Sequence, residues 1–320
     1  MTALAAASAA QVVPRRVSAA EDVSADGAVR GALDPEAVAF ISDMHVGRPL
    51  ARQRWKTMRD YPHQPAASSA LVKEILALPR PPATVINLGD ISLAFGEPED
   101  YEIAAGVLRP LEDAGIKVVH AMGNHDMRAE FLKAFPKQGG TTKVPGRLVS
   151  FVETPHVDFI VLDSLLEPAQ DRRGVYGAMT RQSLGDAQLK WLDETVASAK
   201  KPLFICAHHP HHGLKIPMRI AKNPIVAGYI HGHTHVWTTG YMRGDFDDDA
   251  RMLRTVGLPT FGFEMDVGWG LMRTDGSGAS LGCMARDYYY PLPRAKEARP
   301  AEWDVRVGDW RGREIGFRWA

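Results

Sequence analysis

The sequence predicts an α/β fold in which a two-sheet β-sandwich is flanked by helices. Two observations support this fold class. In the first part of the chain, apolar runs of strand composition alternate with segments of helical period, which is typical of βαβ units in a largely parallel sheet. Later in the chain, short strand-like runs are separated by Gly and Asp turns, which indicates antiparallel pairing and a second sheet.

Helices are expected where apolar residues recur every three or four positions and where Pro or Gly ends the pattern. This rule predicts helices over 67–78, 98–113, 128–135 and 188–199. The second of these begins next to Pro98 and is followed by Gly115, a residue suited to a left-handed helix end. The first is preceded by a long insert, 48–65, which is expected to lie beside any site at the end of the first strand.

Strands are expected in the short apolar runs that turn residues bound. The runs before residue 235 are 39–42, 85–88, 117–122, 148–153, 157–162, 204–207 and 228–231. The spacing of 148–153 and 157–162 predicts that these two strands pair antiparallel. Beyond residue 235, runs around 238–242, 252–256, 268–273 and 279–285 suit the second sheet.

The composition favours one large domain without a general affinity for polyanions. The chain has 320 residues, of which 45% are hydrophobic, enough for a sizeable core. Its 38 basic and 38 acidic residues cancel, so no nucleic-acid patch is evident. No run of eighteen apolar residues occurs, which excludes a membrane span on length. Cys206 and Cys283 are expected to be buried free thiols. The sequence does not indicate an oligomeric state.

The domain prediction divides the chain into three parts. Residues 1–34 are interpreted either as a flexible N-terminal segment or as a clipped export signal, because an Ala-rich apolar stretch begins the chain without a positively charged region before it. The export interpretation places the protein in the periplasm or outside the cell, and the other in the cytoplasm. Residues 35–290 are predicted to form the main domain, and residues 291–320 a C-terminal extension packed on it.

Five of the apolar runs end in polar groups that can bind a metal. If they lie on one sheet, they bring these groups to a single edge, because ligands gather beyond the carboxyl ends of strands in α/β sheets. Asp43 and His45 are two positions apart and face the same side on a regular strand. The five endings are Asp43-Met44-His45, Gly89-Asp90, Gly123-Asn124-His125-Asp126, His208-His209-Pro210 and Gly232-His233-Thr234-His235.

The order of these motifs between Phe40 and His235 resembles the calcineurin-like metallophosphoesterase family, and most closely its class III cyclic-nucleotide phosphodiesterase branch. The resemblance implies a four-layer α/β/β/α fold and two divalent or trivalent transition-metal ions, either Mn, Fe, Zn or Co. It also implies a metal-bridging hydroxide as nucleophile, with His125 as the catalytic residue that protonates the leaving oxygen. The metal ligands it implies are Asp43, His45 and His235 for one ion, Asn124, His208 and His233 for the other, and Asp90 as a bridge between them.

The other histidines and one departure from the family pattern lead to further expectations. His209 is expected behind the ligands or in solvent, because adjacent strand residues face opposite ways. His211 and His212 are expected in a solvated loop, and His231 in packing. The family's G-D-x-x-D motif has Leu93 at its last position here, so His125 is expected to be less strongly oriented, with Asp126 an awkward substitute.

The function expected from this pattern is hydrolysis of small-molecule phosphodiesters such as cyclic nucleotides. One alternative is a phosphomonoesterase on the same site, for which Arg172 and Arg173 are candidates for the extra cationic contacts. Another alternative is a catalytically silent binding module. The presence of all the ligand residues and of His125 argues against the second alternative. No substrate-binding residue is assigned.

Overall fold

The computed structural model describes residues 32–47, 64–139, 143–166, 182–242, 252–262, 265–284, 287–289 and 314–319. Several expectations therefore lie outside the described residues. They concern the N-terminal segment up to residue 31, nearly all of the insert 48–65, Arg172 and Arg173, and most of the C-terminal extension. Within the described residues, no helix has the length and apolar composition needed to cross a membrane.

The first six-stranded sheet has the order β14-β12-β11-β1-β2-β3. Its parallel strands are β1 (Asp34–Ile41), β2 (Pro82–Asn87) and β3 (Lys117–His120). The antiparallel strands are β11 (Gly270–Thr274), β12 (Gly278–Cys283) and β14 (Glu314–Arg318). The assignment of the runs 268–273 and 279–285 to the second sheet is therefore wrong. β11 pairs with β1 and covers an edge whose backbone groups would otherwise lack partners.

The second six-stranded sheet has the order β4-β5-β6-β7-β9-β8. Its strands are β4 (Ser150–Glu153), β5 (Asp158–Val161), β6 (Leu203–Ala207), β7 (Val226–His231), β8 (Thr238–Met242) and β9 (Leu253–Gly257). The predicted antiparallel pairing of β4 with β5 is confirmed. The two short strands β10 (Met265–Val267) and β13 (Asp287–Tyr289) pair separately. The five metal-competent runs thus lie on two sheets, and the expectation of a single sheet edge is wrong.

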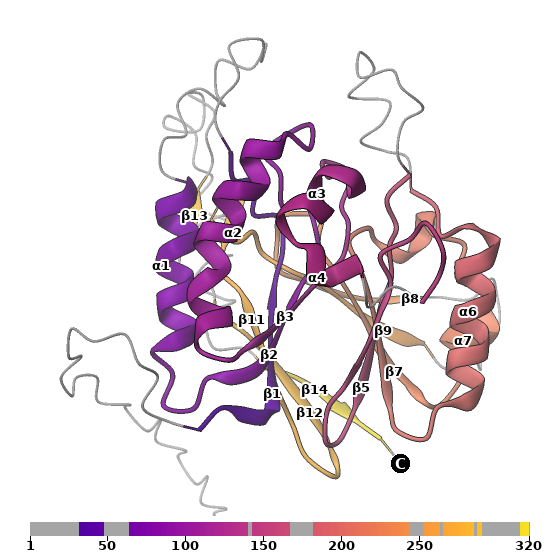
Figure 1. The fold of residues 1–320 in the computed structure, drawn as a ribbon. Coiled ribbons are helices and arrows are strands. Elements are labelled where there is room, and N and C mark those ends of the chain that lie inside the picture. Colours follow the sequence, from indigo (N-terminus) through magenta and orange to yellow (C-terminus); the bar gives the residue numbers. More distant parts are fainter. Residues whose placement is uncertain are drawn as a thin grey trace, which may run out of the picture.

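Helices cover the outer face of each sheet, which confirms the predicted fold class (Figure 1). α1 (Gln64–Leu76) and α2 (Pro98–Asp113) pack on the first sheet. α6 (Gly185–Ser198) and α7 (Met218–Ala221) pack on the second. The remaining helical elements are α3 (Arg128–Ala134), α4 (Pro136–Gly139) and the 3₁₀ turn η2 (His211–Gly213).

The residues of β1 show why the chain forms these layers. Ala37, Ala39 and Ile41 face the helices, whereas Val38 and Phe40 face the other sheet, so the strand alternates between two buried surfaces. Because both faces of the strand are buried, its sequence is a nearly continuous run of apolar residues. The apolar core between the two sheets also includes Ile315 and Phe317 of β14, which come from the predicted C-terminal extension.

Candidate metal centre

The loops that follow β1, β2, β3, β6 and β7 meet between the carboxyl ends of the two sheets. Backbone hydrogen bonds connect the loops within each sheet, such as Asp43 N to Gly89 O at 2.9 Å and Gly232 N to His208 O at 3.0 Å. Other contacts join the loops of one sheet to those of the other: for example, the backbone N–H of His233 donates to both carboxylate oxygens of Asp43, at 3.2 and 3.0 Å. The structure brings together all eight predicted site residues, which are Asp43, His45, Asp90, Asn124, His125, His208, His233 and His235.

Backbone strain is concentrated in these loops. Six non-glycine residues of the described chain have positive φ, and five of them belong to the site: Asp43, His45, Asp90, His233 and His235, with φ from 43° to 68°. Each costs about 1–2 kcal/mol relative to an ordinary conformation, and such residues cluster at functional sites. The expectation that Asp43 and His45 share a side as alternate residues of a regular strand is wrong. β1 ends at Ile41, and the left-handed loop after it aims both side chains.

One group of hydrogen-bond acceptors converges around His45. The Nδ1 of this residue lies 3.2 Å from the carbonyl oxygen of Leu93, which can only accept, so Nδ1 carries the proton and Nε2 presents a lone pair. That Nε2 lies 3.2 Å from Nε2 of His235 and 3.7 Å from Oδ2 of Asp90. His235 Nε2 is in turn 3.3 Å from Oδ1 of Asp43. The residues predicted to hold the first ion therefore face one another with their acceptor atoms.

A second acceptor group converges around His208. Its Nδ1 lies 2.9 Å from the carbonyl oxygen of Leu88, so its Nε2 also presents a lone pair. Around that Nε2 are Oδ1 of Asn124 at 3.0 Å, Oδ2 of Asp90 at 3.2 Å and Nδ1 of His233 at 3.2 Å. The same oxygen of Asp90 faces both groups. This arrangement fits the bridging position that the sequence predicts for Asp90.

The electrostatics of the two groups favour bound positive charge. Burial acts to raise the pKa of Asp43 and of Asp90, but the neighbouring histidines outweigh it and hold both pKa values well below their usual range. Burial acts to lower the pKa of His208, but Asp90, Asp43 and Asp126 together outweigh it and raise the pKa to about 9, so a proton occupies Nε2 of this ring when no other cation does. Buried acceptors that face one another need a cation between them. The set of His and Asp side chains is therefore consistent with a dinuclear metal site.

His125 lies at the edge of the first acceptor group. Its ring packs edge-on against His45 with centroids 4.8 Å apart, and its Nε2 is 3.9 Å from Oδ2 of Asp90. Its Nδ1 lies 3.0 Å from the carbonyl oxygen of Ala94. With Leu93 in place of the second carboxylate, a backbone carbonyl one residue further on orients this histidine. That it does so less strongly than a carboxylate stays a prediction.

Asp126 does not orient His125 in place of the missing carboxylate, but holds backbone groups of two loops. Its carboxylate accepts hydrogen bonds from the backbone N–H groups of Ile91, Ser92 and Gly123 at 2.9 to 3.1 Å, and from the Tyr101 hydroxyl at 3.3 Å. Burial, together with the charge of Asp90, raises the pKa of Asp126 to about 7. This residue joins the loop after β2 to the loop after β3.

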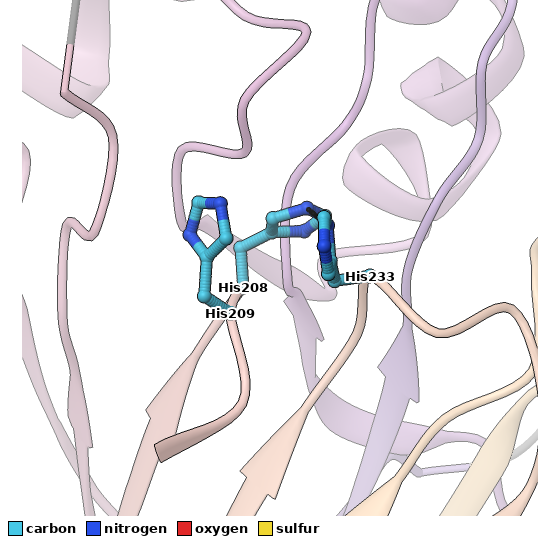
Figure 2. A group of neighbouring side chains, drawn as sticks. All are labelled: His208, His209 and His233. Atoms are coloured by element: carbon cyan, nitrogen blue, oxygen red, sulfur yellow. Dashed lines mark hydrogen bonds between the residues drawn. The ribbon is translucent and has the colours of Figure 1, made fainter. Parts of the chain in front are cut away.

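His209 packs against two of the predicted ligands (Figure 2). The ring centroids of His208, His209 and His233 are 4.8, 4.9 and 5.1 Å apart. The side chain is fully buried, so the solvent alternative for His209 is wrong. Its Nδ1 lies 2.8 Å from Oγ of Ser164, and burial lowers its pKa to about 2. His209 therefore lies directly beside two predicted ligands, with one ligand atom of each of the three histidines within 4.8 Å of the others.

Of the remaining histidines, His212 and His231 agree with their predictions, whereas His211 is half-buried with its ring edge-on to Tyr229 at 5.9 Å, so the expectation of a solvated side chain there is wrong. His211 and His212 form the turn η2 after Pro210, and His212 is exposed. His231 is buried at the end of β7, where its Nδ1 lies 2.8 Å from the carbonyl oxygen of Gly232.

The sequence analysis missed Asp163 and Ser164, which follow β5. Asp163 accepts two hydrogen bonds from the Arg128 guanidinium, at 2.6 and 2.8 Å, and Ser164 contacts His209. The signal that identified the other loops was also present here, since the apolar run 159–162 ends in a carboxylate and a hydroxyl. The antiparallel pairing of this strand with β4 gives no sign of a site, but its parallel pairing with β6 directs its carboxyl end to the centre.

Comparison with known proteins agrees with this geometry. The family model described as calcineurin-like phosphoesterase matches residues 37–237. A probable cyclic nucleotide phosphodiesterase from Rhodopseudomonas palustris is 34% identical over 134 residues, a match that covers 40% of this chain and 42% of the relative.

Among solved structures, a dimetal phosphatase from Danio rerio superposes with a TM-score of 0.59 at 13% identity, covering 90% of this chain and 100% of that one. This likeness supports the fold. The family model spans more than half of the sequence, and the paired His and Asp groups agree with it: the chain belongs to the calcineurin-like phosphoesterase family, whose members are metal-dependent phosphoesterases.

Proposed function

We propose that this chain hydrolyses phosphodiesters of small molecules, with cyclic nucleotides as the leading substrate class. The observation that carries the proposal is the pair of acceptor groups around His45 and His208, which share one carboxylate oxygen of Asp90. The partial match to a probable cyclic nucleotide phosphodiesterase supports the substrate class.

Each side chain of the centre has a role in this proposal. Asp43, His45 and His235 would hold one ion, Asn124, His208 and His233 the other, and Asp90 both. Two ions so held supply a hydroxide nucleophile near neutral pH and neutralise the phosphoryl charge. The carbonyl groups of Leu93 and Leu88 keep the Nε2 lone pairs of His45 and His208 directed at the centre.

His125 is proposed to protonate the departing oxygen. Its Nδ1 proton is held by the carbonyl of Ala94, so the proton that it delivers is a second one, carried on Nε2, the atom that faces the centre. An alkoxide is a poor leaving group at neutral pH, and a proton delivered to it accelerates such a step by roughly a hundred- to ten-thousand-fold.

The rival proposal is a phosphomonoesterase, which needs more positive charge at the centre because a monoester carries up to two negative charges. Arg128 follows the Gly123–Asp126 motif closely in sequence, but its guanidinium forms a bidentate pair with Asp163. That pairing favours the diesterase, because the arginine is already engaged.

An assay of mono- and diester substrates with Mn, Fe, Zn and Co in turn tests this proposal. We expect metal-dependent hydrolysis with a higher kcat/KM for diesters, including cyclic nucleotides, than for monoesters. A preference for monoesters under every metal would contradict the diesterase assignment. Binding of two ions without turnover of any ester would instead support the silent binding module.

A further inference from the structure

Asp100, in the first turn of α2, is a buried carboxylate that holds the loop after β2. The residue is only 4% exposed. Its Oδ2 accepts hydrogen bonds from the Ser92 hydroxyl at 2.8 Å and from the backbone N–H of Leu93 at 3.1 Å. A carboxylate is favoured at this end of a helix, where the backbone N–H groups leave partial positive charge.

The surroundings of Asp100 leave little freedom for the carboxylate or for the loop. A side chain at Gly47 would place its Cβ 2.1 Å from Oδ1 of Asp100, so the segment after β1 packs directly on the carboxylate. Val46 and Ser92 form a parallel bridge beside this contact. The Ser92 hydroxyl also accepts a hydrogen bond from the backbone N–H of Gly96 at 2.8 Å, which closes the loop.

The same loop supplies the two carbonyl groups that orient His45 and His125. The carbonyl of Leu93, whose own N–H is bound by Asp100, faces Nδ1 of His45 at 3.2 Å. The next carbonyl, that of Ala94, faces Nδ1 of His125 at 3.0 Å. The carboxylate therefore binds the peptide N–H that comes directly before these two carbonyl groups, and the two carbonyl groups orient two imidazoles of the centre.

We propose that Asp100 is a positioning residue for both His45 and His125, an inference that rests on the proposed function of those two histidines. Asp100 lies in α2 and acts on the two histidines through the backbone of the loop after β2. In this loop Leu93 occupies the position of the second carboxylate of the family's G-D-x-x-D motif. Loss of the Asp100 charge frees Leu93 and Ala94, so the rings of His45 and His125 lose their fixed direction together. Partners that orient a metal ligand in this way commonly affect metal affinity or activity by about 10- to 100-fold.

The test compares Asp100→Asn with Glu99→Ala. Both donors reach the single oxygen Oδ2 of Asp100, so asparagine preserves the shape but removes the negative charge that strengthens both hydrogen bonds. Glu99 is an exposed acid in the same helical turn. We expect Asp100→Asn to bind its ions about 10- to 100-fold more weakly in equilibrium dialysis against Mn²⁺ or Zn²⁺. Glu99→Ala should match the wild type.

The second measurement is the dependence of hydrolysis on the leaving group. At saturating metal, Asp100→Asn should lose more activity on an alkyl diester than on bis-nitrophenyl phosphate, because His125 matters most for a poor leaving group. Unchanged metal affinity together with an equal loss on both substrates, accompanied by a lower Tm, would overturn the proposal and leave Asp100 a purely structural residue.

Ser92→Ala provides a second variant if Asp100→Asn does not fold. It removes one of the two hydrogen bonds to the carboxylate, and we expect a smaller effect in the same direction on both measurements. If Ser92→Ala matches the wild type in metal affinity and in the leaving-group dependence of hydrolysis, the result counts against the proposal. If the wild-type protein hydrolyses no ester, the proposed function fails, but the metal-affinity comparison still decides whether Asp100 positions His45.

Discussion

At the scale of single residues, the centre depends on which nitrogen of each histidine carries the proton. Backbone carbonyl groups of Leu93, Leu88 and Ala94 each face an Nδ1 atom, at 3.2, 2.9 and 3.0 Å, and so direct an Nε2 atom inward. These carbonyls belong to residues without chemistry of their own. The orientation of the reactive groups is therefore a property of the loop backbone, and substitutions at Leu88, Leu93 and Ala94 that preserve it should be tolerated.

Asp90→Ala should lose both ions and activity together, because a single oxygen of Asp90 faces both acceptor groups. Bound metal per chain, measured by elemental analysis after desalting, provides the test. The exposed Glu102 on α2 offers a matched control, since Glu102→Ala also removes one acid. Two ions retained at the wild-type ratio in Asp90→Ala would contradict the bridging assignment.

His125→Ala should keep both ions but lose much of its activity on alkyl or ribosyl diesters, roughly a hundred- to ten-thousand-fold. The loss on bis-nitrophenyl phosphate should be distinctly smaller, because a nitrophenolate departs without a proton. Steady-state rates on the two kinds of diester, with metal content measured in parallel, provide the comparison. A fall in metal content with equal losses on both substrates would indicate that His125 only supports Asn124.

At the scale of elements, the contact between β3 and α3 contains a buried histidine that the chemistry does not use. His120 ends β3 and packs on Phe131 and Phe135, with ring centroids 5.3 and 4.8 Å away. Its Nδ1 has no hydrogen-bond partner among the described residues. Burial lowers its pKa from the usual 6.5 to about 3, so this imidazole stays neutral in the folded protein until the solution is strongly acidic.

His120→Leu should therefore change how stability depends on pH. Between about pH 6.5 and pH 3 the unfolded chain binds a proton at His120 that the folded chain does not, so acid destabilises the wild type through this residue. The variant lacks that contribution, and its free energy of unfolding should fall less on acidification. Urea unfolding at pH 7 and at pH 4.5 measures the difference, and parallel losses in the two proteins would show that His120 is not involved.

At the scale of the whole molecule, an ion pair joins the two halves of the sandwich. Arg128 of α3, on the side of the first sheet, donates two hydrogen bonds to Asp163, which follows β5 of the second sheet. Asp163 is fully buried and Arg128 is 13% exposed. Asp163 also accepts a hydrogen bond from the backbone N–H of Leu148 at 2.8 Å. The pair therefore anchors the loop that carries Ser164 to the rest of the site.

Arg128→Ala should lower the free energy of unfolding by about 3–5 kcal/mol, because it leaves a buried carboxylate without its cation. A matched control exists at the surface, where Arg219 and Asp193 form a pair of the same bidentate type with 67% and 43% of their side chains exposed. Arg219→Ala should change the free energy of unfolding far less, because water and salt screen an exposed pair. Urea denaturation of both variants gives the comparison, and similar losses in the two would contradict the proposed role of the Arg128 pair.

Much of the fold and of the candidate site could be predicted from local sequence. Polar residues such as Asp90 and Asn124 directly follow apolar runs, and this order is a property of the chain that no tertiary contact can alter. Helix limits were also local, since Pro98 begins α2 and Gly115, with φ of 81°, follows its end. The ligand roles themselves stay predictions until metal binding is measured.

The sequence by itself determined which chemical groups this protein places at the ends of its strands, because residue order and apolar periodicity are local properties. Only the tertiary structure decided that β6 and β7 form a different sheet from β1 to β3, and that β11 closes the edge of β1. Strand partners are chosen by contacts between residues far apart in sequence, such as Ala39 with Leu271. For the same reason the folded chain alone shows that Ala94 orients His125, and that Asp100 holds the loop which supplies that carbonyl.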